Sequence, residues 1–187
     1  IEKRWGQAAY NEANSLISAR CDSNGILPSQ WYPTDIAVEL AGFVARLSHS
    51  DKAFFLKSMG CFVAESTLQG AYAGFLKKND PDQTAKTIPV LFSSLWSNVP
   101  FSTNKKDAGE YEFRITASTL TYSDSMFFAG FLESVMSLTG LPNIKSGIID
   151  DKSRSLLIVT ISSDGKNKNL APVEIPIENE QQIMEAR

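Results

Sequence analysis

Apolar residues recur at helical spacing in four stretches of the first hundred residues. They predict a helix over residues 3–19, a second beginning at Thr34 or Asp35, a third over residues 51–77 and a fourth over 84–99. Ser50 or Asp51 is expected to begin the third helix. We therefore expect the first half of the chain to be helical.

The third predicted helix is the longest and mixes bulky residues with glycine. Gly60, Gly70 and Gly74 each cost about 1 kcal/mol relative to alanine in a helix. Close approach of a second backbone would offset that cost, and we expect the helix to lie at the centre of the fold. The alternative is that the glycines mark breaks between shorter helices.

The pattern changes to short strand-like runs after residue 100. Strands are predicted over residues 101–106 and 111–117, and a hairpin over 143–150 and 155–162. Between them, one helical face collects eight apolar residues: Met126, Phe127, Phe128, Phe131, Leu132, Val135, Met136 and Leu138. This order predicts an α+β fold, with N-terminal helices packed on an antiparallel sheet and a long apolar helix before a C-terminal β-hairpin.

The same pattern divides the chain into three parts. Residues 1–24 form an N-terminal helix suited to dimerisation or docking, and residues 25–169 form the α+β domain. Residues 170–187 form an acidic tail that we expect to be partly disordered, although residues 173–177 could add an edge strand.

Composition narrows the classes of function. The chain has 187 residues, of which 43% are hydrophobic, and a net charge of −3, so no basic surface for nucleic acid is expected. No apolar run approaches the roughly 20 residues that span a bilayer, so no integral membrane segment is predicted. Two cysteines without a CxxC spacing favour a reducing, cytoplasmic location.

Four local features accompany this order of elements: Trp31-Tyr32-Pro33, Met59-Gly60 to Glu65 with Tyr72, Leu95-Trp96, and Phe128-Ala129-Gly130-Phe131 followed by Leu138-Thr139-Gly140. Over residues 25–162 the chain resembles the superfamily of ligand-binding domains in nitric-oxide signalling and Golgi transport. That superfamily includes haem-NO-binding domains, the vinyl-reductase-like regulatory domain and TRAPP tethering subunits, and the chain is most similar to a bacterial branch. The resemblance implies a fold that binds a small apolar ligand or other proteins, commonly as a dimer.

For haem-binding members, the resemblance implies that a histidine on a helix ligates the haem iron. It also implies that a Tyr-x-Ser-x-Arg motif binds the haem propionates. The nearest string, residues 111–114, lacks that spacing and the serine, and the single histidine, His49, lies in a polar junction. Some tethering-complex members hold an acyl chain on a cysteine, but Cys61 lies in an apolar helix, where cysteine is ordinarily a core residue. We therefore predict no cofactor.

Catalytic and metal-binding patterns are missing from the sequence. There is no Gly-x-Ser-x-Gly elbow and no phosphate-binding glycine loop. His49 has serine and aspartate neighbours, but adjacent residues at a helix start point apart, which favours capping. Asp150, Asp151 and Asp164 lack the spacing of a calcium loop. We predict no catalytic residues, no metal site and no enzymatic activity.

Two acidic residues lie inside apolar helices, where an unpaired carboxylate is costly to bury. If Glu65 and Glu133 faced one another, acid–base chemistry would be conceivable. We favour the simpler interpretation, in which each reaches solvent or pairs with an arginine such as Arg46 or Arg114.

These observations predict a non-enzymatic regulatory or scaffolding domain that acts through protein–protein contacts as a homodimer. The alternative is a sensor that binds a small apolar ligand or tetrapyrrole between helices and sheet. The predicted pocket residues are Phe62, Leu68, Phe128 and Phe131. The predicted interface residues are Trp5, Tyr10, Trp31, Tyr32, Trp96 and Phe127.

Overall fold

The computed structural model describes residues 2–18, 34–96, 99–116 and 121–163. Its α-helices are α1 (Glu2–Ser18), α2 (Thr34–Leu47), α3 (Lys52–Gln69), α4 (Pro81–Leu95) and α5 (Tyr122–Leu138). Its strands are β1 (Phe101–Asp107), β2 (Glu110–Thr116), β3 (Lys145–Asp151) and β4 (Leu156–Ser162). Short 3-10 helices, η1 (Ala73–Phe75) and η2 (Lys152–Arg154), complete the described elements. The predicted α+β class is confirmed.

The four strands form one antiparallel sheet in the order β1-β2-β4-β3. Alternate residues of the two central strands are buried on one face, as the period of a half-covered strand requires. They are Tyr111, Phe113 and Ile115 of β2 and Leu157, Val159 and Ile161 of β4. The two strands predicted over residues 101–106 and 111–117 are present and pair with each other, and the predicted C-terminal hairpin is present as β3 and β4.

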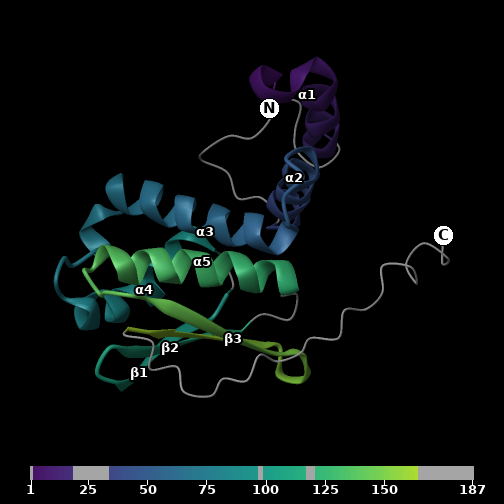
Figure 1. Ribbon diagram of the computed structural model, residues 1–187. Helices are drawn as coiled ribbons and strands as arrows, with labels where there is room; N and C mark the ends of the chain where they lie inside the picture. The colour runs from purple at the N-terminus through teal and green to yellow at the C-terminus, as the bar shows by residue number, and fades with distance from the viewer. Residues whose placement is uncertain (1, 19–33, 97–98, 117–120, 164–187) are drawn as a thin grey trace.

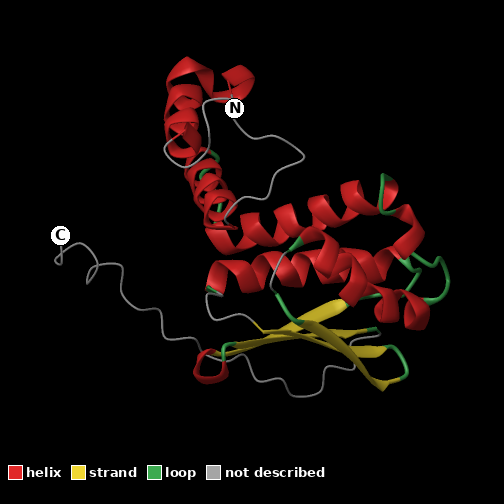
Figure 2. Cartoon of the chain, turned by 180° about the vertical axis from the view of Figure 1, so that it is seen from behind, coloured by secondary structure: helices red, strands yellow, loops and turns green. Residues whose placement is uncertain are grey.

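The helices form two layers above this sheet (Figures 1 and 2). α5 packs on β3 and β4, and α4 packs on β1. α3 lies on α5 and runs alongside it, so α5 is covered by the sheet below and by α3 above. α1 and α2 continue from one end of α3 and project away from the sheet (Figure 1).

Two glycines set the distance between α3 and α5. A Cβ atom on Gly60 would overlap the carbonyl oxygen of Phe127, and one on Gly130 would overlap that of Lys57. Each glycine therefore admits the backbone of the opposite helix. The Cys61 thiol donates to the Gly130 carbonyl oxygen at 3.2 Å, which adds a polar contact to this crossing. The expected close approach at Gly60 is present.

The third helix ends earlier than predicted. It stops at Gln69, because Gly70 adopts a non-helical conformation and donates its N–H to the Thr67 carbonyl oxygen. The predicted end at residue 77 was wrong, and Gly74 lies in η1. The alternative of shorter helices therefore holds at Gly70, whereas the close-packing interpretation holds at Gly60.

Side-chain caps fix the starts of three helices. Asp51 accepts from the Phe54 N–H and begins α3, as predicted. Asp80 accepts from the Gln83 N–H, so α4 begins at Pro81, three residues before the predicted start, and it ends at Leu95. Thr121 and Asp124 form a capping box that begins α5.

The half-buried Glu133 pairs with a lysine, whereas the prediction was that it reaches solvent or pairs with an arginine. Its Oε1 atom lies 2.8 Å from Lys57 Nζ and also accepts from the backbone N–H of Ser146 at 3.0 Å. α3, α5 and β3 are thereby joined through one carboxylate. Glu65 is exposed and accepts from Ser134 Oγ at 3.3 Å, so the two acids have separate partners.

Several sequence predictions remain predictions. Trp31, Tyr32, the edge strand at 173–177 and the acidic tail lie outside the described residues. The division at residues 24 and 169 is likewise untested. Among the described helices, none has the length and apolar character needed to cross a membrane.

Replacing either glycine of the α3–α5 crossing should destabilise the fold. Gly130→Ala should lower the free energy of unfolding by about 3 kcal/mol or more, because the added methyl meets backbone that cannot rotate away. This loss would oppose the helix-propensity gain of about 1 kcal/mol. Urea denaturation followed by circular dichroism measures the change.

Gly74→Ala is the matched control. An added Cβ there meets no atom within 4 Å, so the free energy of unfolding should change by less than about 0.5 kcal/mol. Equal effects of Gly130→Ala and Gly74→Ala would contradict the role assigned to the crossing.

Candidate functional site

The predicted pocket residues separate into two groups. Leu68, Phe128 and Phe131 are buried in the main core, with Phe131 fully buried. Phe62 lies on the outer face of α3 and is 68% exposed. The structure therefore does not bring Phe62 together with the other three.

An aromatic cluster occupies the region around Phe128 and Phe131. Phe92 stacks on Phe101 with ring centroids 4.0 Å apart and meets Phe131 edge to face at 5.5 Å. Trp96 packs edge to face on Phe128, also at 5.5 Å. These contacts fill the space with the protein's own side chains, so a ligand would have to bind elsewhere.

The predicted interface residues also differ in placement. Trp96 and Phe127 pack against each other beside the core, with ring centroids 6.1 Å apart. Trp5 packs with α2 residues in a smaller apolar cluster, and Tyr10 is 41% exposed. Of this set, Tyr10 is the described residue with the most exposed side chain.

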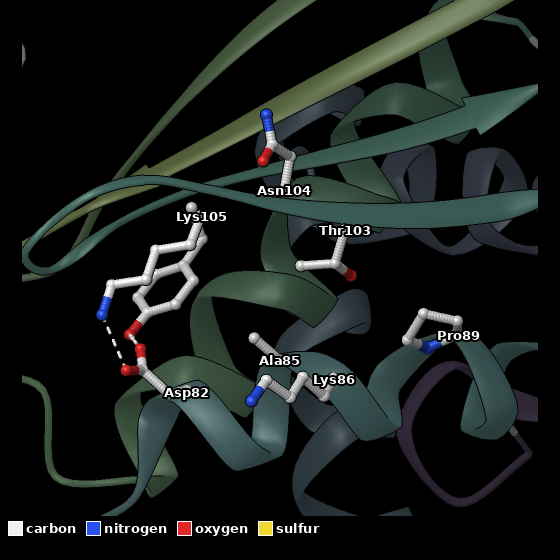
Figure 3. Close-up of a pocket in the computed structure, with 8 residues that line it drawn as sticks. Asp82, Ala85, Lys86, Pro89, Thr103, Asn104 and Lys105 are labelled. Carbon is white, nitrogen blue, oxygen red and sulfur yellow. Dashed lines mark hydrogen bonds and ion pairs between the residues drawn. The ribbon is translucent and has the colours of Figure 1, made fainter.

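A cavity of about 410 Å³ lies between α4 and the β1–β2 hairpin. Its lining residues are Asp82, Ala85, Lys86 and Pro89 of α4, Thr103, Asn104 and Lys105 of β1, and Tyr111 of β2. Figure 3 shows the α4 residues below and Thr103 reaching down from β1. Ala85, Pro89 and the Tyr111 ring give it apolar walls.

One end of the cavity holds a charged cluster. Asp82 Oδ1 accepts from the Tyr111 hydroxyl at 2.5 Å, and Asp82 Oδ2 lies 2.7 Å from Lys105 Nζ (Figure 3). The hydrogen bonds from Lys105 and Tyr111 lower the pKa of Asp82. Burial, followed by the hydrogen bond to Asp82, raises the pKa of Tyr111. Tyr111 therefore stays protonated and acts as a donor.

One hydroxyl oxygen of a lining residue away from this cluster lacks a hydrogen-bond partner among the described residues. Thr103 Oγ1 is buried and has no hydrogen-bond partner among the described residues. A buried hydroxyl without a partner costs about 1–3 kcal/mol.

This arrangement suits binding better than catalysis. Asp82 already accepts hydrogen bonds at both oxygens, and the cavity lining contains no histidine or cysteine to act as base or nucleophile. Sequence reasoning missed the site. Alternation in β2 shows that Tyr111 faces inward, but it does not show that Asp82 of α4 meets its hydroxyl.

The residues weighed for chemistry lie away from the cavity. His49 is exposed in the turn after α2 and has a left-handed backbone conformation, with φ of 51°. Burial raises the pKa of the Cys61 thiol, which is bonded at the α3–α5 crossing. In the described ranges, no three His, Cys, Asp or Glu side chains are grouped to hold a metal ion.

Solved structures of H-NOX proteins are similar to this chain over most of its length. The H-NOX protein from S. oneidensis in the Fe(II)NO ligation state shares 11% identity, with 87% of this chain and 92% of that chain covered and a TM-score of 0.64. The Shewanella woodyi protein in the Fe(II)CO state shares 15% identity, with 91% and 92% covered and a TM-score of 0.61. The unliganded Fe(II) protein from K. algicida shares 16% identity, with 91% and 92% covered and a TM-score of 0.59. The fold is the H-NOX fold.

At these identities the similarity concerns the fold alone. The sequence matches no protein-family model and no curated protein. The haem-NO-binding part of the sequence resemblance is therefore supported at the level of fold. Its vinyl-reductase-like, TRAPP and bacterial-branch parts stay predictions.

The side chains of this H-NOX fold do not fit a histidine-ligated haem. The only histidine in the sequence, His49, lies in an exposed turn and not on a helix that faces the cavity. The segment from Tyr111 to Arg114 lies within strand β2, where the Tyr111 hydroxyl donates to Asp82 and Arg114 Nε donates to Glu112. Each of these side chains already binds a carboxylate of this chain.

The Tyr111 hydroxyl should give the stability a characteristic pH dependence. Tyr111→Phe should lower the free energy of unfolding by about 1 kcal/mol near neutral pH. Because folding raises the pKa of Tyr111, its protonated hydroxyl contributes its full stability at pH values below about 10, the ordinary pKa of tyrosine. This contribution is lost as the pH rises through the raised pKa. The lowered pKa of Asp82 stabilises the fold above about pH 4, and this stabilisation is lost on acidification.

The difference in the free energy of unfolding between wild type and Tyr111→Phe should therefore be largest between about pH 4 and about pH 10 and shrink outside that range. Urea titrations at a series of pH values measure it. Tyr72→Phe is the control, because Tyr72 has a ring contact but no hydroxyl partner among the described residues. A difference that does not vary with pH would argue against the hydrogen bond.

Proposed function

We propose that this chain is a non-enzymatic sensor domain that binds a small ligand in the cavity between α4 and the β1–β2 hairpin. The H-NOX fold supports this alternative better than the scaffolding function predicted first. H-NOX proteins in the Fe(II)NO and Fe(II)CO states hold diatomic ligands, which makes ligand sensing a natural use of the fold. The residues of this chain favour a ligand other than haem.

The cavity itself is the observation that carries the proposal. Small-molecule sites are concave and mostly apolar, with a few polar groups that fix orientation. This cavity has apolar walls at Ala85 and Pro89 and a charged cluster at one end. Its volume of about 410 Å³ falls in the range of ligand sites.

The position of the cavity offers a route from binding to response. Asp82 belongs to α4, whereas Lys105 and Tyr111 belong to β1 and β2, so their contacts join helix to hairpin. A ligand in the cavity would contact both α4 and the hairpin and so change how α4 packs on the sheet. A sensor requires that its ligand bind more tightly to the protein with α4 in one position than to the protein with α4 in another.

Native mass spectrometry of the protein purified from its own source tests this proposal. We expect a retained small molecule and an absorption spectrum without the Soret band of haem. Ala85→Leu, which fills the cavity from α4, should lose the molecule. Val90→Leu is the matched control, because Val90 is on α4 but 57% exposed.

Retention of the molecule by a folded Ala85→Leu protein would overturn the assignment of this cavity. A Soret band in wild-type protein would instead show that the fold binds haem through a different set of ligands.

A second candidate function, protein contact through α3, is supported by two exposed rings. Phe54 and Phe62 are 69% and 68% exposed on the same helix. If this face makes a homodimer, light scattering at micromolar concentration should give a dimer for wild type and a monomer for the Phe54→Ser, Phe62→Ser protein. A monomeric wild type would contradict this second function. Homodimerisation, a protein partner and a cytoplasmic location otherwise stay predictions.

A further inference from the structure

The charge distribution in the cavity indicates which ligand chemistry it would accept. Two ammonium groups, on Lys86 and Lys105, and one carboxylate, on Asp82, line it. The carboxylate is already occupied at both oxygens, by the Tyr111 hydroxyl and by Lys105. The local charge is therefore positive.

Of the two lysines in the cavity lining, Lys86 is the one that makes no hydrogen bond or close ion pair with a described residue, although its charge also acts on Asp82. Asp82 and Lys86 lie one turn apart on α4, and Figure 3 shows the Lys86 ammonium turned toward the Asp82 end of the cavity. Lys86 makes no hydrogen bond or ion pair with another described residue, whereas Lys105 is bound to Asp82 at 2.7 Å. An incoming anion could bind Lys86 without breaking a contact within the described protein.

The remaining walls suit an apolar group next to that charge. Ala85 and Pro89 of α4 also line the cavity on either side of Lys86 in sequence, and Thr103 faces them from β1 (Figure 3). A molecule that binds here would place its charged group at one end and its hydrocarbon part along α4. A cation would meet Lys86 and Lys105 with like charge, and the occupied Asp82 could not compensate for both.

We propose that the ligand is a small organic anion, whose carboxylate or similar group binds Lys86 and whose apolar part lies along Ala85 and Pro89. This inference rests on the proposed function, because it assigns the ligand class of the same cavity. It predicts both a preference for anions and a requirement for a hydrocarbon part.

Four probes of simple composition separate these requirements: hexanoate, hexanol, hexylammonium and acetate. Each is titrated into the full chain, and binding is followed by NMR shifts of residues that line the cavity. Hexanoate should bind about tenfold more tightly than hexanol, the order expected for one charge-assisted hydrogen bond. Hexylammonium should bind more weakly than hexanol, and acetate more weakly than hexanoate, because acetate lacks the chain.

Lys86→Met keeps most of the side-chain length and removes the charge. It should weaken hexanoate binding about tenfold and leave hexanol binding unchanged. The control is Lys145→Met, because Lys145 is exposed on β3, at the edge of the sheet opposite β1. That variant should bind hexanoate like wild type.

The outcomes distinguish the two levels of the proposal. If hexanol binds as tightly as hexanoate, or Lys86→Met leaves hexanoate binding unchanged, the anion inference is overturned and the cavity remains the ligand site. If neither hexanoate nor hexanol shifts the cavity residues, the proposed function fails together with the inference.

Discussion

The structure depends on the close approach of two helix backbones at Gly60 and Gly130. Because neither position has a side chain, α3 and α5 approach until each glycine faces a carbonyl of the other helix. The contact also places Lys57 of α3 beside Glu133 of α5, and Glu133 holds the start of β3 through Ser146. α3, α5 and the sheet are therefore held in one fixed arrangement.

This arrangement determines where a ligand can and cannot bind. With α5 held between α3 and the sheet, its Phe128 and Phe131 meet Phe92 of α4, which stacks on Phe101 of β1, and these rings fill the interior. Such an interior contributes stability through apolar burial and leaves little room for a bound molecule. One open space lies at the periphery of the described residues, where α4 packs against the β1–β2 hairpin.

The comparison with H-NOX structures illustrates that a shared fold does not transfer a chemistry. The arrangement of helices and sheet is similar at 9–16% sequence identity. The histidine needed to coordinate haem iron is not similarly placed, since the sole histidine of the sequence lies in an exposed turn. Function is set by the groups on the scaffold, and in our proposal those groups are Asp82, Lys86, Lys105 and Tyr111.

The sequence by itself determined the identity and order of the elements, because these depend on local spacing and caps. Asp51 begins α3, and alternation buries Tyr111, Phe113 and Ile115. Tertiary structure alone decided which glycine packs and which ends a helix, that Glu133 pairs with Lys57, and that Asp82 meets Tyr111. The last two pairs lie 76 and 29 residues apart in sequence. Local periodicity carries no information about such contacts, because they form only when separate elements pack together.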